Sequence, residues 1–182
     1  MSAIIDVLER AVIGTRAELP ARLLALRLLS IRSARQRQSY WYKVHTRAII
    51  QRTMRADSCG VDVGSHRGLL LLAMMQAAPN GRHIAVEPVP ALARNLEHRF
   101  PSVQVVQAAV SDHDGEAIFN EDLSYSGLSS LQSTDAHTHA FSRAIQMRTV
   151  TLDSLLADVP VDFIKIDAMG AHLQVFHGAR KI

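Results

Sequence analysis

Apolar and polar positions follow two different patterns along the chain, and the change falls near residue 57. Before this point, apolar residues recur at the spacing of a helix. Helices are expected at residues 3–13, 21–31 and 32–56. After it, short apolar runs of four to six residues alternate with helical segments. The pattern predicts a helical N-terminal arm, residues 1–56, followed by an α/β domain, residues 57–182.

The α/β domain is expected to contain a parallel sheet with helices on both faces, because its strands are separated by helices. Its strands are predicted at residues 59–64, 83–87, 103–107, 116–119, 146–150 and 163–167. Its helices are predicted at residues 68–78, 90–100, 152–158 and 171–180, the third with Thr151 as its N-cap. Residues 120–142 are rich in Ser and His and are expected to form a loop.

Composition narrows the class of protein. Apolar residues make up 48% of the 182 residues and charged residues 20%, which is typical of a globular chain. No apolar run reaches the ~18 residues of a membrane span. The start of the chain lacks the basic segment of a signal peptide, so we expect a cytoplasmic protein. Cys59 has no other cysteine to pair with, and we expect it to be a small buried group.

The balance of basic and acidic residues also changes near residue 57. Residues 1–56 hold 11 of the 20 basic residues and 3 of the 17 acidic residues. A basic arm can bind nucleic acid or an anionic membrane surface, or it can present a solvated Arg face. We expect no nucleic-acid partner, and peripheral contact with the inner membrane face stays an alternative. The aromatic cluster Tyr40, Trp41 and Tyr42 is expected to pack the arm onto the domain.

Candidate chemistry lies where the strands end, because ligands of open α/β sheets bind beyond the carboxyl ends of the strands. Gly64 and Gly68 follow the first strand with a spacing that allows a tight turn at the start of a helix. The spacing is neither that of dinucleotide sites nor that of a P-loop. By itself the segment also fits an ordinary strand–turn–helix.

Glu87 ends the second strand, 23 residues after Gly64. A carboxylate in this place accepts hydrogen bonds from the ribose hydroxyls of a bound nucleoside. With Asp62 it makes the first crevice acidic, and Arg67 is the fixed cation nearby. This combination favours a cationic nucleoside such as S-adenosylmethionine over a polyphosphate.

The blocks VDVGSHRG, IAVEPVPALARNLEHRF, VQVVQAAVSDHDGEAIF, TVTLDSLL and FIKIDAMGAHLQVFHGA resemble, in order, the FkbM-type S-adenosylmethionine-dependent methyltransferases. The resemblance covers residues 59–180 and implies a class I methyltransferase fold, which is Rossmann-like. It also implies a methyl transfer to a hydroxyl of a sugar, glycolipid or polyketide-type acceptor. The residues that it assigns to the methionine part are Asp62, Gly64, Ser65 and Gly68, with Glu87 for the ribose and Ala109 and its neighbours for the adenine.

Asp167, at the end of the strand FIKID, is expected to orient or deprotonate the acceptor hydroxyl. Lys165 lies on the same face of that strand and is the second candidate catalytic residue. Alternatively, Asp167 caps the following helix and Lys165 pairs with an acid under the sheet. The hydroxyls of residues 124–130 could bind a sugar or form a solvated loop.

The chain also departs from the family pattern. Ala168-Met169-Gly170 stands where the family has Val-Glu-Gly, so Met169 replaces an acid, and His172 stands where a second acid is common. The family's fold continues for about 45 residues beyond the helix at 171–180. We therefore expect FIKID to be an edge strand that favours self-association or a completing partner chain. The alternative function is a degenerate or truncated methyltransferase that binds S-adenosylmethionine without turnover.

Two weaker candidates complete the set. His66 lies in the glycine turn and could make a pH-sensitive contact. Asp135, His137 and His139 have spacing compatible with a metal, but His-x-His arises by chance in a chain with nine His, so no metal site is expected.

Overall fold

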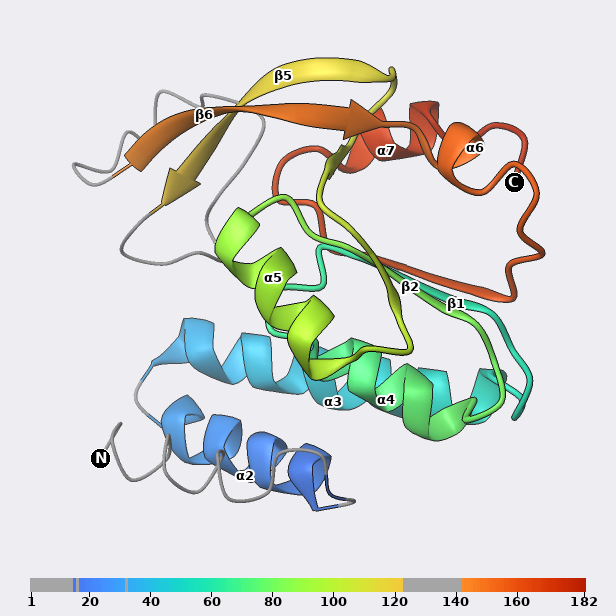
Figure 1. Cartoon of the computed structure of the whole chain (residues 1–182). Coiled ribbons are helices and arrows are strands. Elements are labelled where there is room, and N and C mark those ends of the chain that lie inside the picture. Colours follow the sequence, from blue (N-terminus) through green and yellow to red (C-terminus); the bar gives the residue numbers. More distant parts are fainter. Residues whose placement is uncertain (1–14, 16, 32, 123–141) are drawn as a thin grey trace.

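The computed structural model describes residues 15, 17–31, 33–122 and 142–182 (Figure 1). Its helices are α2 (Glu18–Ser30), α3 (Ala34–Thr53), α4 (Leu69–Ala77), α5 (Pro90–Arg99), α6 (Leu152–Leu155) and α7 (His172–His177). Its strands are β1 (Gly60–Val63), β2 (His83–Val86), β3 (Gln104–Val106), β4 (Ala109–Val110), β5 (Gly115–Asp122), β6 (Ser142–Val150) and β7 (Phe163–Ile166). The helix expected at residues 3–13 lies outside the described residues.

The main sheet has four parallel strands in the order β3-β2-β1-β7. The predicted parallel sheet is confirmed. β7 pairs with β1 on one side, and no other described strand pairs with it. Within the described residues, FIKID is therefore an edge strand, as expected. The register sets Asp62 opposite Lys165 on one side and opposite Ala85 on the other.

Helices cover both faces of this sheet, as predicted (Figure 1). The helices α3, α4 and α5 lie on one face, and α6 and α7 lie on the other. Alternating strand residues explain the two layers, since successive side chains point to opposite faces. Val61 and Val63 join the cluster that holds Val175 of α7, whereas Ala85 joins the cluster of Leu96 from α5. Asp62 and Lys165 share the face of Ala85 and so point toward the helices that precede and follow β1.

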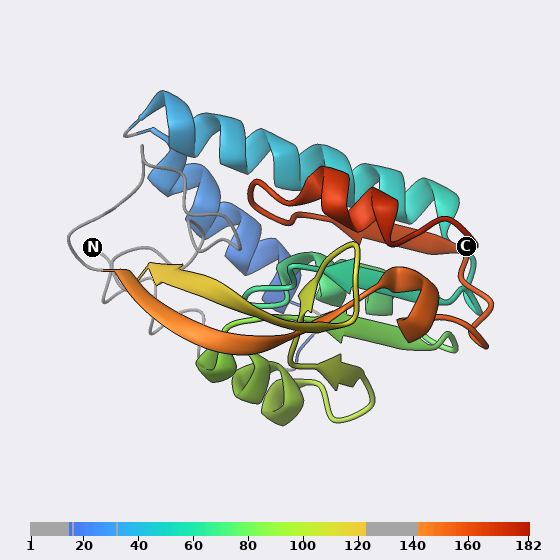
Figure 2. The same ribbon diagram turned by 90° about the horizontal axis from the view of Figure 1, so that it is seen from above.

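The strand predicted at 146–150 does not join the parallel sheet, which corrects the sequence prediction. It extends back to Ser142 as β6 and lies in a second sheet of order β4-β6-β5. β6 pairs antiparallel with β5 over eight residues, from Gly115↔Thr149 to Asp122↔Ser142. The two strands lie beside each other above the main sheet (Figures 1 and 2). The two-residue strand β4 was not predicted.

The helices of the arm pack against the domain. Ile50 of α3, Met54 directly after it and Leu19 of α2 share one apolar cluster with α4. Phe163 of β7 packs against this cluster. Figure 2 shows α3 running along the sheet beside β7. Of the predicted aromatic cluster, Trp41 does not make this contact, since it is 52% exposed and meets the Tyr40 ring edge-on within α3. Tyr42 of the same cluster lies near the strand tips of the domain.

Several local predictions are confirmed. Pro90 begins α5, which ends at Arg99 before Pro101. The Thr151 hydroxyl accepts a hydrogen bond from the Ser154 N–H and caps α6. Cys59 is buried and is a free thiol. No helix in the described part of the chain is long and apolar enough to cross a membrane.

Candidate active site

The turn from Gly64 to Gly68 connects the tip of β1 to α4 and adopts a left-handed backbone at three positions. The φ angles are 72° at Gly64, 50° at His66 and 69° at Gly68. A side chain at Gly64 would overlap the carbonyl oxygen of Asp167, and one at Gly68 would lie 2.6 Å from the Phe100 ring. Both glycines are therefore required by backbone conformation and by close approach.

Hydrogen bonds hold this turn against the tip of β2. The Gly64 N–H donates to the Val86 carbonyl at 2.9 Å. The Ser65 hydroxyl donates to the Asp62 carbonyl at 2.6 Å, and the His66 N–H donates to the Glu87 carboxylate at 2.7 Å. The predicted residues of the two strand tips are thus brought together at one edge of the sheet. This cluster of Asp62, Gly64, Ser65, Gly68 and Glu87 is called the crevice below.

Lys165 pairs with Asp62 across the two neighbouring strands. Its Nζ lies 2.9 Å from Asp62 Oδ1, and it also donates to the carbonyls of Val63 and Gly64 at 3.2 Å and 2.9 Å. Burial lowers the pKa of Lys165, but the carboxylates of Asp62 and Asp167 outweigh burial, so the net pKa is raised. The lysine is thus a buried cation that fixes the tip of β1, which agrees with the alternative of a pair beneath the sheet.

Glu87 is nearly fully buried, with 4% of its surface exposed. Its two carboxylate oxygens accept hydrogen bonds from the N–H groups of His66 and Val89. Burial raises its pKa to about 6, and these two hydrogen bonds oppose the rise. Each carboxylate oxygen has a second lone pair, so Glu87 can accept further hydrogen bonds from hydroxyl groups.

His66 does not behave as a sensor of pH near neutrality. Burial and the nearby cations Arg67, Lys43 and Lys165 together lower its pKa to about 4. The imidazole is therefore neutral between pH 5 and 8, outside the range in which a histidine switch operates. The prediction of a pH-sensitive contact at His66 is therefore wrong for this pH range.

Helix α3 also contributes to the site, which the sequence analysis missed. Burial raises the pKa of Tyr42, and the charges of Lys165, Asp167 and Asp62 act on its phenol. Burial lowers the pKa of Lys43, on which Asp167 and Lys165 also act. These two side chains therefore lie close to the tips of β1 and β7. The aromatic cluster was a signal for this, but it was assigned to packing.

The remaining candidates are more dispersed. Asp167 is exposed, and the N-cap of α7 is Ala171 without a side-chain hydrogen bond, so Asp167 does not cap that helix. Met169 follows it in the turn and is 40% exposed. Ala109 lies in β4 within an apolar cluster that includes Val89 of the segment after β2. Residues 124–130, Asp135, His137 and His139 lie outside the described residues.

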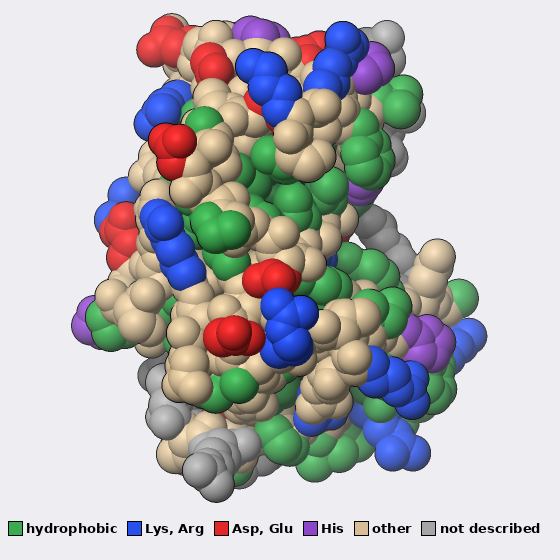
Figure 3. Space-filling model, turned by 90° about the vertical axis from the view of Figure 1, so that its right-hand side faces the viewer, with side chains coloured by type: hydrophobic (Ala, Val, Ile, Leu, Met, Phe, Trp, Pro, Cys, Tyr) green, Lys and Arg blue, Asp and Glu red, His purple; other side chains and the backbone are tan. Residues whose placement is uncertain are grey.

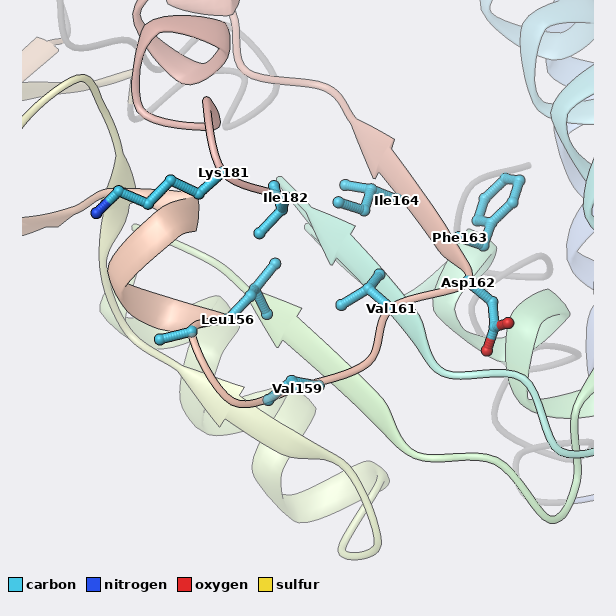
Figure 4. A pocket seen from close by; sticks show the side chains of 9 residues that line it. Leu156, Val159, Val161, Asp162, Phe163, Ile164, Lys181 and Ile182 are labelled. Atoms are coloured by element: carbon cyan, nitrogen blue, oxygen red, sulfur yellow. The ribbon is translucent and has the colours of Figure 1, made fainter.

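A separate groove lies at the amino ends of the strands, away from this crevice. Its lining comes from the segment between α6 and β7, from β7 itself and from the last two residues. Figure 3 shows hydrophobic side chains gathered on this side of the molecule, and Figure 4 shows Val161, Ile164 and Ile182 pointing toward one another. None of the predicted site residues lines this groove.

The crevice fits a ligand with a cationic group and hydroxyl donors. Asp62 has no exposed surface, and its Oδ2 has no hydrogen-bond partner among the described residues. Leaving a buried carboxylate oxygen unpaired costs free energy, which a donating ammonium group offsets. Glu87 supplies hydrogen-bond acceptors for hydroxyl groups. The ammonium group of the methionine part and the ribose hydroxyls of S-adenosylmethionine are donors that match these two carboxylates.

Comparison with known proteins gives one family. A model of the methyltransferase FkbM domain matches residues 62–182. No curated protein matches the chain. The solved structure of precorrin-6y C5,15-methyltransferase from Geobacter metallireducens GS-15 is 25% identical over 34% of this chain and 37% of its own, with a TM-score of 0.29. The plantazolicin methyltransferase BpumL in complex with SAH is 10% identical over 58% of this chain and 44% of its own, with a TM-score of 0.31. The chain thus spans less than half the length of either.

Proposed function

Since the chain belongs to the FkbM methyltransferase family, we propose that it is an S-adenosylmethionine-dependent O-methyltransferase. The acceptor is a hydroxyl of a sugar, glycolipid or polyketide-type molecule. The observation that carries the proposal is the acidic crevice between β1 and β2, where buried Asp62 and Glu87 flank a left-handed glycine turn.

The residues of the crevice hold the cofactor. The backbone of the turn, with Asp62 and Ser65, receives the methionine part. Glu87 accepts hydrogen bonds from the ribose, and Ala109 with its apolar neighbours lines the adenine. When bound, S-adenosylmethionine supplies a methyl group that is already activated by the sulfonium. The chain therefore has only to orient an acceptor oxygen and take its proton.

Asp167 takes that proton. Its carboxylate is exposed at the tip of β7, next to the glycine turn, where an acceptor hydroxyl can reach it. Lys165 contributes to the same reaction indirectly: it is a buried cation that holds the glycine turn in place. Tyr42 and Lys43 of α3 face this region and supply hydrogen-bond donors for a hydroxylated acceptor.

A second candidate function is binding of S-adenosylmethionine without turnover. Met169 supports it, because it stands where the family has an acid and lies exposed in the turn after Asp167. A thioether cannot take a proton from a hydroxyl. In this case the crevice binds the cofactor, and no acceptor is methylated.

Three further expectations join the proposal. The division at residues 56 and 57 separates the arm from the methyltransferase domain. The protein is cytoplasmic, and its basic arm contacts anionic membrane surfaces when the acceptor is a glycolipid. The unpaired edge of β7 favours self-association. Co-sedimentation with anionic vesicles at low salt tests the membrane contact, and sedimentation velocity tests self-association.

Transfer of a radiolabelled methyl group from S-adenosylmethionine to a panel of sugars, glycolipids and polyketides tests the proposal. We expect label in one hydroxylated acceptor and a loss of at least about a hundredfold in rate for Asp167→Asn. Asp158→Asn, a change in an exposed acid of the segment before β7, is the matched control and keeps its rate. Cofactor binding without label in any acceptor would favour the second candidate.

A further inference from the structure

The carbonyl of Arg67, in the glycine turn, accepts hydrogen bonds from two arginines of distant segments. Arg22 of α2 donates through Nη2 at 2.9 Å. Arg99, the last residue of α5, donates through Nη1 at 3.1 Å. Guanidinium groups form strong charge-assisted hydrogen bonds, so this carbonyl is held from the arm and from the domain at once.

Glu18 of α2 holds both arginines in place. Its Oε1 pairs with Arg99 Nη2 and lies 3.6 Å from Arg22 Nη1. The glutamate side chain is 2% exposed, and those of Arg22 and Arg99 are 10% and 14% exposed. Water therefore screens this network little, and the geometry of the two guanidinium groups depends on the carboxylate between them.

The peptide unit between Arg67 and Gly68 is fixed at both of its polar atoms. Its carbonyl accepts the two guanidinium donors, and its N–H donates to the Ser65 carbonyl at 2.8 Å. His66, directly before it, has a left-handed backbone that is rare for a residue with a side chain. Such a conformation persists only where its surroundings hold it.

We propose that Glu18 is a positioning residue for the cofactor site. Through Arg22 and Arg99 it sets the orientation of the Arg67–Gly68 peptide, and so presets the turn for the methionine part of the cofactor. The arm helix α2 is then a component of the cofactor site, although it lies more than 30 residues before the turn in the sequence. This inference rests on the proposed function for the identity of the ligand.

The test compares S-adenosylhomocysteine binding by calorimetry for the whole chain and for Glu18→Gln, which keeps the shape and removes the charge. We expect at least fivefold weaker binding in Glu18→Gln. The matched control is Arg55→Gln, which breaks an ion pair with Asp162 at the opposite ends of the strands. The control is expected to stay within twofold of the unchanged chain.

A loss smaller than fivefold in folded Glu18→Gln overturns the proposal. Where Glu18→Gln does not fold, the same binding measurement is made on Arg99→Lys. An ammonium group lacks the planar fork by which Arg99 bonds the Glu18 carboxylate and the Arg67 carbonyl at once. At least fivefold weaker binding in Arg99→Lys supports the proposal, and a smaller loss overturns it.

Hydrogen exchange without ligand separates this inference from the proposed function. We expect the amides of residues 64–68 to exchange at least fivefold faster in Glu18→Gln, with the amides of β2 unchanged. Equal exchange at 64–68 overturns the inference, and so does faster exchange in both segments, which reports general destabilisation. If the unchanged chain does not bind S-adenosylhomocysteine, the proposed function fails, and hydrogen exchange alone decides on Glu18.

Discussion

The tips of β1 and β2 and the tip of β7 lie at the same edge of the sheet but are built in opposite ways. At the first two, Asp62 and Glu87 are buried and already bonded to the protein. At the third, Asp167 is exposed, and its carboxylate makes no hydrogen bond or ion pair with a described residue. The proposed cofactor half of the site, at the tips of β1 and β2, is thus part of the core. The proposed acceptor half, at Asp167, lies at an exposed edge. Substitutions in the two halves should therefore differ in their cost to folding.

The largest effect is expected for Lys165→Met, which leaves Asp62 buried without its cation. We expect the free energy of unfolding to fall by about 3–5 kcal/mol, the range for breaking a buried pair. Urea unfolding measures it, and Asp62→Asn in the same chain should restore at least half of the loss. A fall below about 1 kcal/mol would mean that the pair is not part of the core.

The next effect is expected for Gly64→Ala. Its Cβ would overlap the Asp167 carbonyl oxygen, and its φ of 72° disfavours a side chain. We expect a loss of about 3 kcal/mol in the free energy of unfolding. Gly170→Ala is the matched control, because Gly170 has a φ of 75° with nothing within 4 Å of the added Cβ. The control should lose only about 1 kcal/mol, and equal losses would remove the argument from close approach.

Glu87 gives a smaller effect that depends on pH. Its pKa is raised from 4.5 to about 6, so the folded chain holds the proton more tightly than the unfolded chain. The resulting stability, about 2 kcal/mol, is fully present below pH 4.5 and is lost as the pH rises through 6. Denaturant unfolding between pH 4 and 7 measures this slope, which Glu87→Gln should flatten. An identical slope in the variant contradicts the assignment to Glu87.

The smallest effect on stability is expected for Asp167→Asn. The carboxylate is exposed, and water screens its attraction to Lys165 and Lys43, so the free energy of unfolding should change by less than about 1 kcal/mol. Thermal and denaturant unfolding measure it, alongside S-adenosylhomocysteine binding, which should stay within about twofold. A loss comparable to that of Lys165→Met would show that both halves belong to the core and would end the comparison.

The arrangement of the tips of β1 and β2 could be predicted from the sequence because the information is local, and the assignment of these residues to a cofactor stays a prediction. The strand and helix periods, Gly64, Gly68 and Glu87 all lie within one strand–helix–strand segment, and the structure brings them together. Lys165 was predicted to share a face with Asp167, and its pairing with an acid under the sheet stood only as an alternative; the structure shows that this acid is Asp62. The choice between them depends on which strand is the neighbour of β1, which no local pattern specifies.

Contacts between distant segments could not be predicted. The antiparallel pairing of β6 with β5 depends on the connection between them, which was interpreted only as a loop. The role of α2 at Arg67 depends on three segments separated by more than 30 residues each. Tyr42 was singled out by its aromatic neighbours, but only the position of α3 over the strand tips turned it toward Asp167 and Lys165.

The central claim is that the crevice at Glu87 holds S-adenosylmethionine. Calorimetric titration of the chain with S-adenosylmethionine and S-adenosylhomocysteine tests it most directly, beside Glu87→Ala and the control Glu97→Ala, an exposed acid of α5. The account predicts saturable binding, unchanged in Glu97→Ala and weakened by about thirtyfold, or about 2 kcal/mol, in Glu87→Ala. A folded chain that binds neither ligand, or a Glu87→Ala variant that binds as tightly as the unchanged chain, would contradict it.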